Sequence, residues 1–388
     1  MRRIAGATLA FLSSQALACV LLVFLLLLTF IGTIEQVERG LYAVQKEYFG
    51  SLFLVHHFFG FLPIPLPGVR LLLALLFLNL VCGGLIKMRG GLHHLGVFVA
   101  HFGVVLLLLG SFAKYYGGVT GYVQLFEGDV ASSFTAYSEW EVAIAPCGAG
   151  TVDEYVIPES ALARAQGEAT AAFRAEGMPF DVTLSHYARH ARPVLDDSPG
   201  AYPVVEGFSL LPLEPSTVPE EHVPGVYVEL HGKQLVEAQS SILWGQARFP
   251  WVVAVDGVPW RIVLRRREWP LPFSVRLDEF RAEFHPGTSK PRAFVSRVTR
   301  TEDGSAEEIE ISMNKPMRRG GYSFYQSSWG RGPRRDGGGE GEYSVLAVSK
   351  DPAERVPFYA SIVIVAGLLL HFARRLVVYL RAQQRGRG

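Results

Sequence analysis

The stretch that decides the fold is residues 91–112, GLHHLGVFVAHFGVVLLLLGSF. It contains no Asp, Glu, Lys or Arg, and it is long enough to cross the apolar core of a bilayer, which takes about 20 helical residues. Histidines occur at its start, His93 and His94, and once in its interior, at His101. His101 lies about 14 Å along the predicted helix, near the middle of a bilayer, and His94 precedes it by two turns on the same face. A polar side chain at that depth requires a partner.

Three other segments have the same apolar character. They are residues 9–31 (LAFLSSQALACVLLVFLLLLTFI), 69–86 (VRLLLALLFLNLVCGGLI) and 356–372 (VPFYASIVIVAGLLLHF). Together with 92–112 they predict a bundle of four transmembrane helices, with an external loop over 32–68. A secretory signal is the alternative for the first segment, because Met-Arg-Arg precedes it. The length of that segment and the lack of an A-x-A cleavage site favour a retained helix.

The basic residues are distributed unevenly around these segments. They precede the first helix, fill the turn between the second and third, and follow the fourth, at Arg2, Arg3, Lys87, Arg89, Arg374, Arg375, Arg381, Arg385 and Arg387. Positive flanks mark the cytoplasmic side of a membrane. We therefore expect a multi-pass protein of the cytoplasmic (inner) membrane with both termini cytoplasmic. Because the basic residues report topology and the net charge is only +1, no nucleic-acid partner is expected.

This topology divides the chain into three parts. Residues 1–112 form a membrane domain with three helices, 113–355 form an extracytoplasmic domain, and 356–388 form the fourth helix with a basic cytoplasmic tail. The middle part contains many short alternating runs such as GVYVELHG and EIEISM, which predict an antiparallel β-rich sandwich or barrel. At about 240 residues it is large enough for two lobes. Within it, residues 158–180 (PESALARAQGEATAAFRAEGMPF) predict one amphipathic helix.

Several kinds of chemistry have no motif in this chain. The three cysteines include no C-x-x-C pair, so thiol redox chemistry and covalent haem attachment to this chain are not expected. There is no phosphate-binding glycine loop, no G-x-S-x-G and no H-E-x-x-H. His186 and His190 have a spacing that suits a helical metal site, but their segment lacks an apolar helical face. We therefore interpret these two histidines as surface residues. The run Arg265–Arg267 is interpreted as a solvated strand end.

The histidine within the third predicted helix has two interpretations. His101 either forms a hydrogen bond with a neighbouring helix, for instance with Asn79, or ligates haem iron as a neutral imidazole. His94 is a weaker candidate ligand, because it lies on the same helix and cannot reach the opposite face of the iron. A second axial ligand would therefore come from elsewhere. His93 and His371 lie near the cytoplasmic ends of their helices, where interface roles are equally reasonable.

Several stretches follow one another in a recognisable order. They are TFIGTIEQVERGLYAVQKEYFGSLF, IPLPGVRLLLALLFLNLVCG, HHLGVFVAHFGVVLLLLGSF, NKPMRRGGYSFYQSSWG and YSVLAVSKDP. In this order the sequence resembles the ResB (CcsB) family of System II cytochrome c biogenesis proteins. The resemblance covers both ends of the chain and the arrangement of three helices, a large external β domain and a final helix. The middle, about residues 140–290, is not matched motif by motif.

The resemblance implies a function and a set of partners. ResB proteins work with a ResC/CcsA-type membrane protein, with apocytochrome c and with thiol-reducing proteins. Together they hold haem or move it across the membrane for covalent attachment. A histidine in the helix before the external domain is implicated in binding haem in this family, and His101 occupies that position.

The resemblance also bounds what this chain does alone. The six tryptophans here are scattered, whereas the W-G-x-x-W-x-W-D haem-handling motif belongs to the partner. We therefore expect a subunit of a holocytochrome c synthase (haem lyase) complex that has no catalytic residue of its own. The alternative is a membrane-anchored envelope scaffold whose β domain binds protein partners without haem chemistry.

Overall fold

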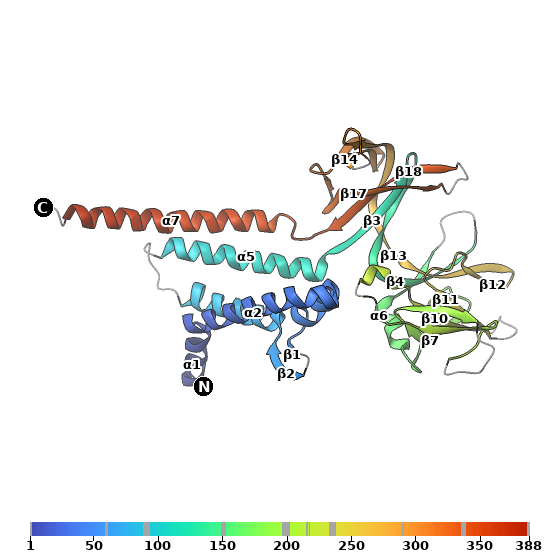
Figure 1. Cartoon of the computed structure of the whole chain (residues 1–388), viewed down its shortest axis with the longest axis horizontal. Coiled ribbons are helices and arrows are strands. Elements are labelled where there is room, and N and C mark those ends of the chain that lie inside the picture. The colour runs from blue at the N-terminus through green and yellow to red at the C-terminus, as the bar shows by residue number, and fades with distance from the viewer. Residues whose placement is uncertain are drawn as a thin grey trace. The chain divides into compact units, whose positions relative to one another are not determined.

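The computed structural model describes residues 2–58, 61–87, 94–148, 153–195, 202–214, 216, 218–232, 238–288, 291–334 and 339–385. The chain divides into two compact units (Figure 1). The helical unit comprises Met1–Gly118 and Asp351–Gly388, and the β unit comprises Val119–Lys350.

Helices dominate the first unit. Its elements are α1 (Arg2–Leu12), α2 (Gln15–Arg39), α3 (Leu41–Val44), the π-helix η1 (Gln45–Phe49), β1 (Phe53–Phe58), β2 (Leu62–Pro67), α4 (Val69–Asn79), the π-helix η2 (Leu80–Ile86), α5 (Leu95–Gly117) and α7 (Val356–Arg385). Four segments are long and apolar enough to cross a membrane: Gln15–Arg39, Val69–Ile86, Leu95–Gly117 and Val356–Arg385. The four apolar helices expected from the sequence are therefore present. The first begins at Gln15, after a break, and the fourth continues to Arg385 through its basic residues.

A polar corner separates α1 from α2. The backbone of Ser14 is extended, with ψ 132°. The Asn79 side chain donates hydrogen bonds to the carbonyls of Leu12 at 2.7 Å and Ser14 at 2.9 Å. The end of α1 leaves the Leu12 carbonyl without an intrahelical partner, and the Ser14 carbonyl also accepts from the backbone of Ala18, so Asn79 stabilises the break. The hydrogen bond between Asn79 and His101 considered from the sequence is therefore not formed.

The segment expected as an external loop, 32–68, is largely ordered. Helix α2 continues to Arg39, α3 and η1 follow, and β1 pairs with β2 in an antiparallel hairpin. Apolar side chains from these elements pack with α2 and α4 in one cluster, made of Leu21, Leu28, Val44, Tyr48, Leu54, Val69 and Leu72. Burial of this apolar surface holds the segment against the two helices.

Glycines bring α5 and α7 into direct backbone contact. Gly96, Gly103 and Gly110 are seven residues apart and buried, so they form one face of α5. A Cβ atom at Gly103 would lie 2.6 Å from Ile364 Cγ1 and 2.9 Å from its backbone nitrogen. Small residues at helix interfaces permit this close approach.

Near the N-terminal end of α5, each helix contributes a glycine to the contact. A Cβ atom at Gly96 would lie 2.5 Å from the backbone nitrogen of His371, and one at Gly367 of α7 would lie 2.4 Å from that of Ala100. At this end a glycine on each helix therefore lies against the backbone of the other helix. Figure 1 shows α5 and α7 running side by side.

The second unit is built from antiparallel strands. Ten of them form one sheet, in the order β15-β14-β13-β4-β3-β18-β17-β16, with β12 on β13 and β5 on β4. Their bounds are β3 (Val119–Phe126), β4 (Val130–Pro146), β5 (Tyr155–Pro158), β12 (Trp251–Val255), β13 (Val258–Phe284), β14 (Pro291–Glu302), β15 (Ser305–Ser312), β16 (Met317–Arg319), β17 (Tyr322–Pro333) and β18 (Glu340–Lys350). A second sheet has the order β11-β10-β7-β6. Its strands are β6 (Thr170–Phe173), β7 (Asp181–Ala188), β10 (Gly225–His231) and β11 (Gln239–Trp244), and β8 (Ala191–Leu195) pairs with β9 (Phe208–Pro212).

Two apolar cores show that this unit has two lobes. In the barrel lobe the large sheet curls until it is nearly closed, around Phe134, Phe273, Val275, Leu277, Val298, Ile311, Phe324, Leu346 and Val348. In the sandwich lobe its other end packs on the second sheet, through Val142, Ile144, Ile262, Leu264, Val182, Leu184, Val226, Val228 and Leu230. The long strands β4 and β13 contribute to both cores.

The helix predicted over 158–180 is much shorter than expected. Helix α6 (Glu159–Leu162) continues only through the 3₁₀ turn Ala163–Ala165. The backbone is extended at Gln166, which ends the helix, Gly167 then adopts φ +60°, and Thr170–Phe173 pairs with β7 as strand β6. Sheet pairing therefore overrides the helix propensity of the alanine-rich segment.

We predict that Gly103→Ala lowers the free energy of unfolding by about 1–3 kcal/mol, because the new methyl group overpacks the contact between α5 and α7. Thermal unfolding of the detergent-solubilised chain, followed by far-UV circular dichroism, measures the change. Gly6→Ala is the matched control, since no atom lies within 4 Å of the added Cβ atom. Equal melting temperatures for the two variants would contradict the close contact.

Candidate functional site

His101 lies in the first third of α5 and packs against η2. Its side chain is half-buried. A Cβ atom at Gly84 of η2 would lie 3.1 Å from both Cγ and Nδ1 of the imidazole, so the missing side chain there makes room for the ring. Nδ1 of His101 is buried, and it has no hydrogen-bond partner in the described part of the chain.

The π-helical turn explains how Gly84 reaches this position. Helix α4 widens into η2 over Leu80–Ile86, which contains Gly83 and Gly84. Gly83 faces the corner before α2, where an added Cβ atom would lie 3.2 Å from the carbonyl oxygen of Ser13. The two glycines thus allow one turn to contact both the corner and His101. Local π-helix is often found at functional sites.

The buried ring nitrogen of His101 lies among apolar helices without a hydrogen-bond partner in the described part of the chain. Burying a polar group without a hydrogen bond costs free energy, so such groups require a specific explanation. A neutral imidazole can ligate haem iron through one ring nitrogen. The donor type at His101 therefore fits a haem ligand.

The other histidines of the helical unit lie in different settings. His94 is exposed at the N-terminal cap of α5. The backbone of His371 contacts Gly96 in the α5–α7 interface. His93 lies outside the described residues. No ring contact joins His101 to a second histidine within the described part of the helical unit.

The β1–β2 hairpin contains a buried polar pair that the sequence did not reveal. The hydroxyl of Tyr48 in η1 lies 2.5 Å from Nδ1 of His56 in β1. Both side chains are buried, and burial raises the pKa of Tyr48 to about 12. The alternation of the strand FLVHHF was the available signal, because it places His56 and His57 on opposite faces.

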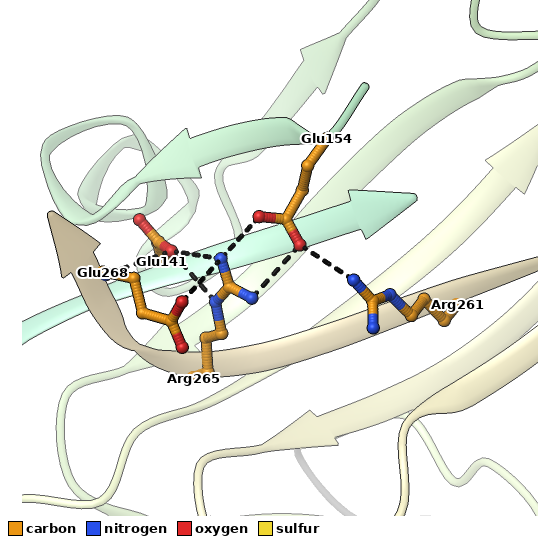
Figure 2. Close-up of polar contacts among 5 residues, drawn as sticks. All are labelled: Glu141, Glu154, Arg261, Arg265 and Glu268. Atoms are coloured by element: carbon orange, nitrogen blue, oxygen red, sulfur yellow. Dashed lines mark hydrogen bonds and ion pairs between the residues drawn. The ribbon is translucent and has the colours of Figure 1, made fainter. Parts of the chain in front are cut away.

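In the β unit, Arg265 on β13 lies at the centre of an ion cluster (Figure 2). Its Nε donates to Glu141 on β4 at 3.0 Å, and its Nη2 donates to Glu154 at 2.6 Å. Glu268 and Arg261 complete the cluster, at 4.0 Å from Arg265 and 3.5 Å from Glu154 respectively. The Glu141 side chain is only 2% exposed, so its charge depends on Arg265 for compensation.

The neighbouring arginines are also bound to partners. Arg266 lies over the ring of Trp140, 4.8 Å from its centroid, and Arg267 lies over Trp269 at 3.7 Å. The expectation that Arg265–Arg267 form a solvated strand end is therefore wrong. The physical reason is that the register of β13 against β4 shifts between Arg266 and Glu268, where these strands pass from one lobe to the other.

The external histidines occupy separate settings in the sandwich lobe. His186, with φ +51°, packs its ring against Tyr227 at 5.5 Å. His190 accepts a hydrogen bond from the backbone of Val223 at 3.1 Å, and its ring lies 5.6 Å from that of His222. Within the described residues, no group of three or more His, Cys, Asp or Glu side chains has the arrangement of a metal site.

We predict that Arg265→Ala lowers the free energy of unfolding of the β unit by about 3–5 kcal/mol, because it leaves Glu141 buried without a counter-charge. All six tryptophans, Trp140, Trp244, Trp251, Trp260, Trp269 and Trp329, lie in this unit, so tryptophan fluorescence of the intact chain reports its unfolding. The matched control is Arg276→Ala, which removes an exposed pair with Asp278 and should cost at most about 1 kcal/mol. Similar losses in both variants would contradict the central role of Arg265.

We also predict that the free energy of unfolding depends on pH through Glu141. Burial raises its pKa above the ordinary value of 4.5, although Arg265 acts in the opposite direction. The folded chain therefore keeps this proton to higher pH than the unfolded chain does. The stabilising contribution is complete below the ordinary pKa and is lost as the pH rises through the raised value. Glu141→Gln should lose less stability than the wild type between acidic and neutral pH, as measured by urea unfolding. Parallel pH profiles would show that another group is responsible.

Comparison with known proteins adds a direct match in the β unit. Residues 253–340 match the model of the ResB-like family. Part of the chain is also similar to Protein NrfI of Wolinella succinogenes, with 29% identity over 105 residues. That match covers 26% of this chain and only 11% of the length of NrfI. The resemblance to ResB proteins, carried by the two ends of the sequence, is therefore confirmed by a family match over residues 253–340.

Proposed function

We propose that this chain is a ResB-like subunit of a System II cytochrome c biogenesis complex. It holds haem in its helical unit and positions apocytochrome c with its β unit. The ResB-like match over residues 253–340 supports the general role in cytochrome c biogenesis. The observation that carries the haem-binding part is the buried Nδ1 of His101, which has no partner in the described part of the chain.

The membrane orientation is part of this proposal. Lys87 at the end of η2 and the arginines in the last part of α7 are the basic flanks of the apolar helices. Both termini would then be cytoplasmic and the β unit extracytoplasmic, where apocytochrome c receives its haem. The four helices with the length and composition of transmembrane segments support this arrangement.

In this proposal His101 supplies one axial ligand to haem. The contact with Gly84 orients the imidazole ring, because the ring fills the space that a side chain at that position would occupy. The second ligand comes from a ResC/CcsA-type partner, which also carries the tryptophan-rich haem-handling motif. His94 is the weaker candidate within this chain, because it is exposed at the start of α5.

The β unit serves as the platform for protein partners. Its two lobes share the strands β4 and β13, and the Arg265 cluster lies where these strands change register. The shared strands hold the two lobes together, so the platform presents one fixed surface to its partners. Apocytochrome c and thiol-reducing proteins are the proposed partners.

We predict that the purified complex of this chain with its partner shows a haem absorption band that His101→Gly weakens by at least about ten-fold, because an axial ligand is lost. Added imidazole should restore the band by replacing the missing ring. His57→Gly is the matched control, since it removes an exposed histidine of the same unit, on β1, and should leave the band unchanged. An unchanged spectrum in His101→Gly would remove His101 from the site.

A deletion strain distinguishes this function from an envelope scaffold. Loss of the chain should abolish covalent haem in c-type cytochromes, and the wild-type gene should restore it. A scaffold without haem chemistry would purify without haem, and its loss would leave these cytochromes mature.

A further inference from the structure

The helical unit contains a cavity of about 670 Å³ that is separate from His101. Its walls come from α2, α3, η1, the start of α4 and Tyr115 near the end of α5. This volume lies within the range of about 300–1,000 Å³ that is usual for small-molecule sites. No histidine, cysteine or methionine is among the residues that line it, so its chemistry differs from that of a haem-iron site.

The polar part of the cavity is positively charged. Lys46 is the charged residue among those lining it, and Gln36 and Gln45 also line it. The nearest carboxylates along the chain, Glu35 and Glu47, are both bound to Arg39. Lys46 is exposed and makes no ion pair within the described part of the chain, so it remains available for an anion.

The remaining walls are apolar and open to the surroundings. Phe49 is 39% exposed, Leu73 is 40% exposed and Leu41 is 57% exposed, although all three line the cavity. Exposed apolar surface of this kind is stabilised when hydrocarbon covers it. A ligand that suits the whole cavity therefore combines an anionic head with a hydrocarbon part.

Aromatic and basic side chains place the cavity at one end of the apolar helices. Tyr115, which lines it, is followed by Tyr116, whose hydroxyl accepts a hydrogen bond from Arg70 at 2.5 Å. Lys114 pairs with Asp351 at 3.3 Å beside them. Tyrosines together with charged residues at the end of an apolar helix mark the level of lipid headgroups.

We propose that this cavity binds an anionic phospholipid. The phosphate lies against Lys46 and the two glutamine amides, and the acyl chain lies along Phe49 and Leu73. The ligand is a bilayer lipid because the apolar walls require hydrocarbon and the tyrosines lie at headgroup level. A bound lipid would contact η1, the start of α4 and the end of α5 at once. These three elements are separate in the sequence, so the lipid would hold them together.

Native mass spectrometry of the intact, detergent-solubilised chain tests this site. Phosphatidylglycerol and phosphatidylcholine with identical acyl chains are the probes. The wild type should bind phosphatidylglycerol more tightly. Lys46→Gln should weaken that binding about five-fold, the effect expected of one basic residue near an anionic lipid. Leu73→Trp, which fills the cavity without changing charge, should weaken the binding of both lipids.

Lys87→Gln is the matched control, because it removes a lysine whose ammonium group donates to Ser13 at the other end of the second span. It should bind both lipids as the wild type does. Equal phosphatidylglycerol binding by wild type and Lys46→Gln would overturn the proposal, as would equal affinity of the wild type for the two lipids. Displacement of phosphatidylglycerol by inorganic phosphate at equal concentration would also overturn it, because the acyl chain would then contribute nothing.

Discussion

Direct contact between the backbones of α5 and α7 is the constraint on which the helical unit depends. Three glycines at intervals of seven residues form the contacting face of α5. On α7, Gly367 lies against the backbone of this face. His101 and Gly103 are two residues apart, about 200° around an α-helix. Once the glycine face lies against α7, the imidazole must point to the other side, towards η2. Packing between two helices therefore sets the direction of the His101 side chain.

Each unit places polar groups where its elements change direction or register. Asn79 binds the carbonyls at the corner between α1 and α2, and Tyr48 binds His56 beneath the hairpin. In the β unit, Arg265 compensates the buried charge of Glu141 where β13 shifts against β4. Buried polar groups are tolerated when they are paired, and removal of one partner exposes the full cost of burying the other. His101 Nδ1 differs from these groups, because it is buried and has no protein partner in the described part of the chain.

The predictions that came from long patterns were correct. Apolar runs of the right length became the four helices, and alternating runs became antiparallel strands in two lobes. Predictions that depended on distant partners were wrong. The alanine-rich segment after Pro158 lost most of its helix to pairing with β7. The three arginines were expected in solvent. Arg265 instead binds Glu141 on β4 and Glu154 in a loop, both more than 100 residues away in the sequence.

The sequence by itself determined the number of apolar helices, the β-rich character of the middle region and the placement of His101 within an apolar helix. These follow from composition and periodicity within one segment, because burial of apolar surface and satisfaction of backbone hydrogen bonds act locally on it. Only the tertiary structure decided that Asn79 binds the α1–α2 corner, that Gly84 makes room for the imidazole, and that Lys46 lines a cavity. Each of these depends on which elements lie next to each other. That choice is made by the packing of many side chains at once, and no single segment encodes it.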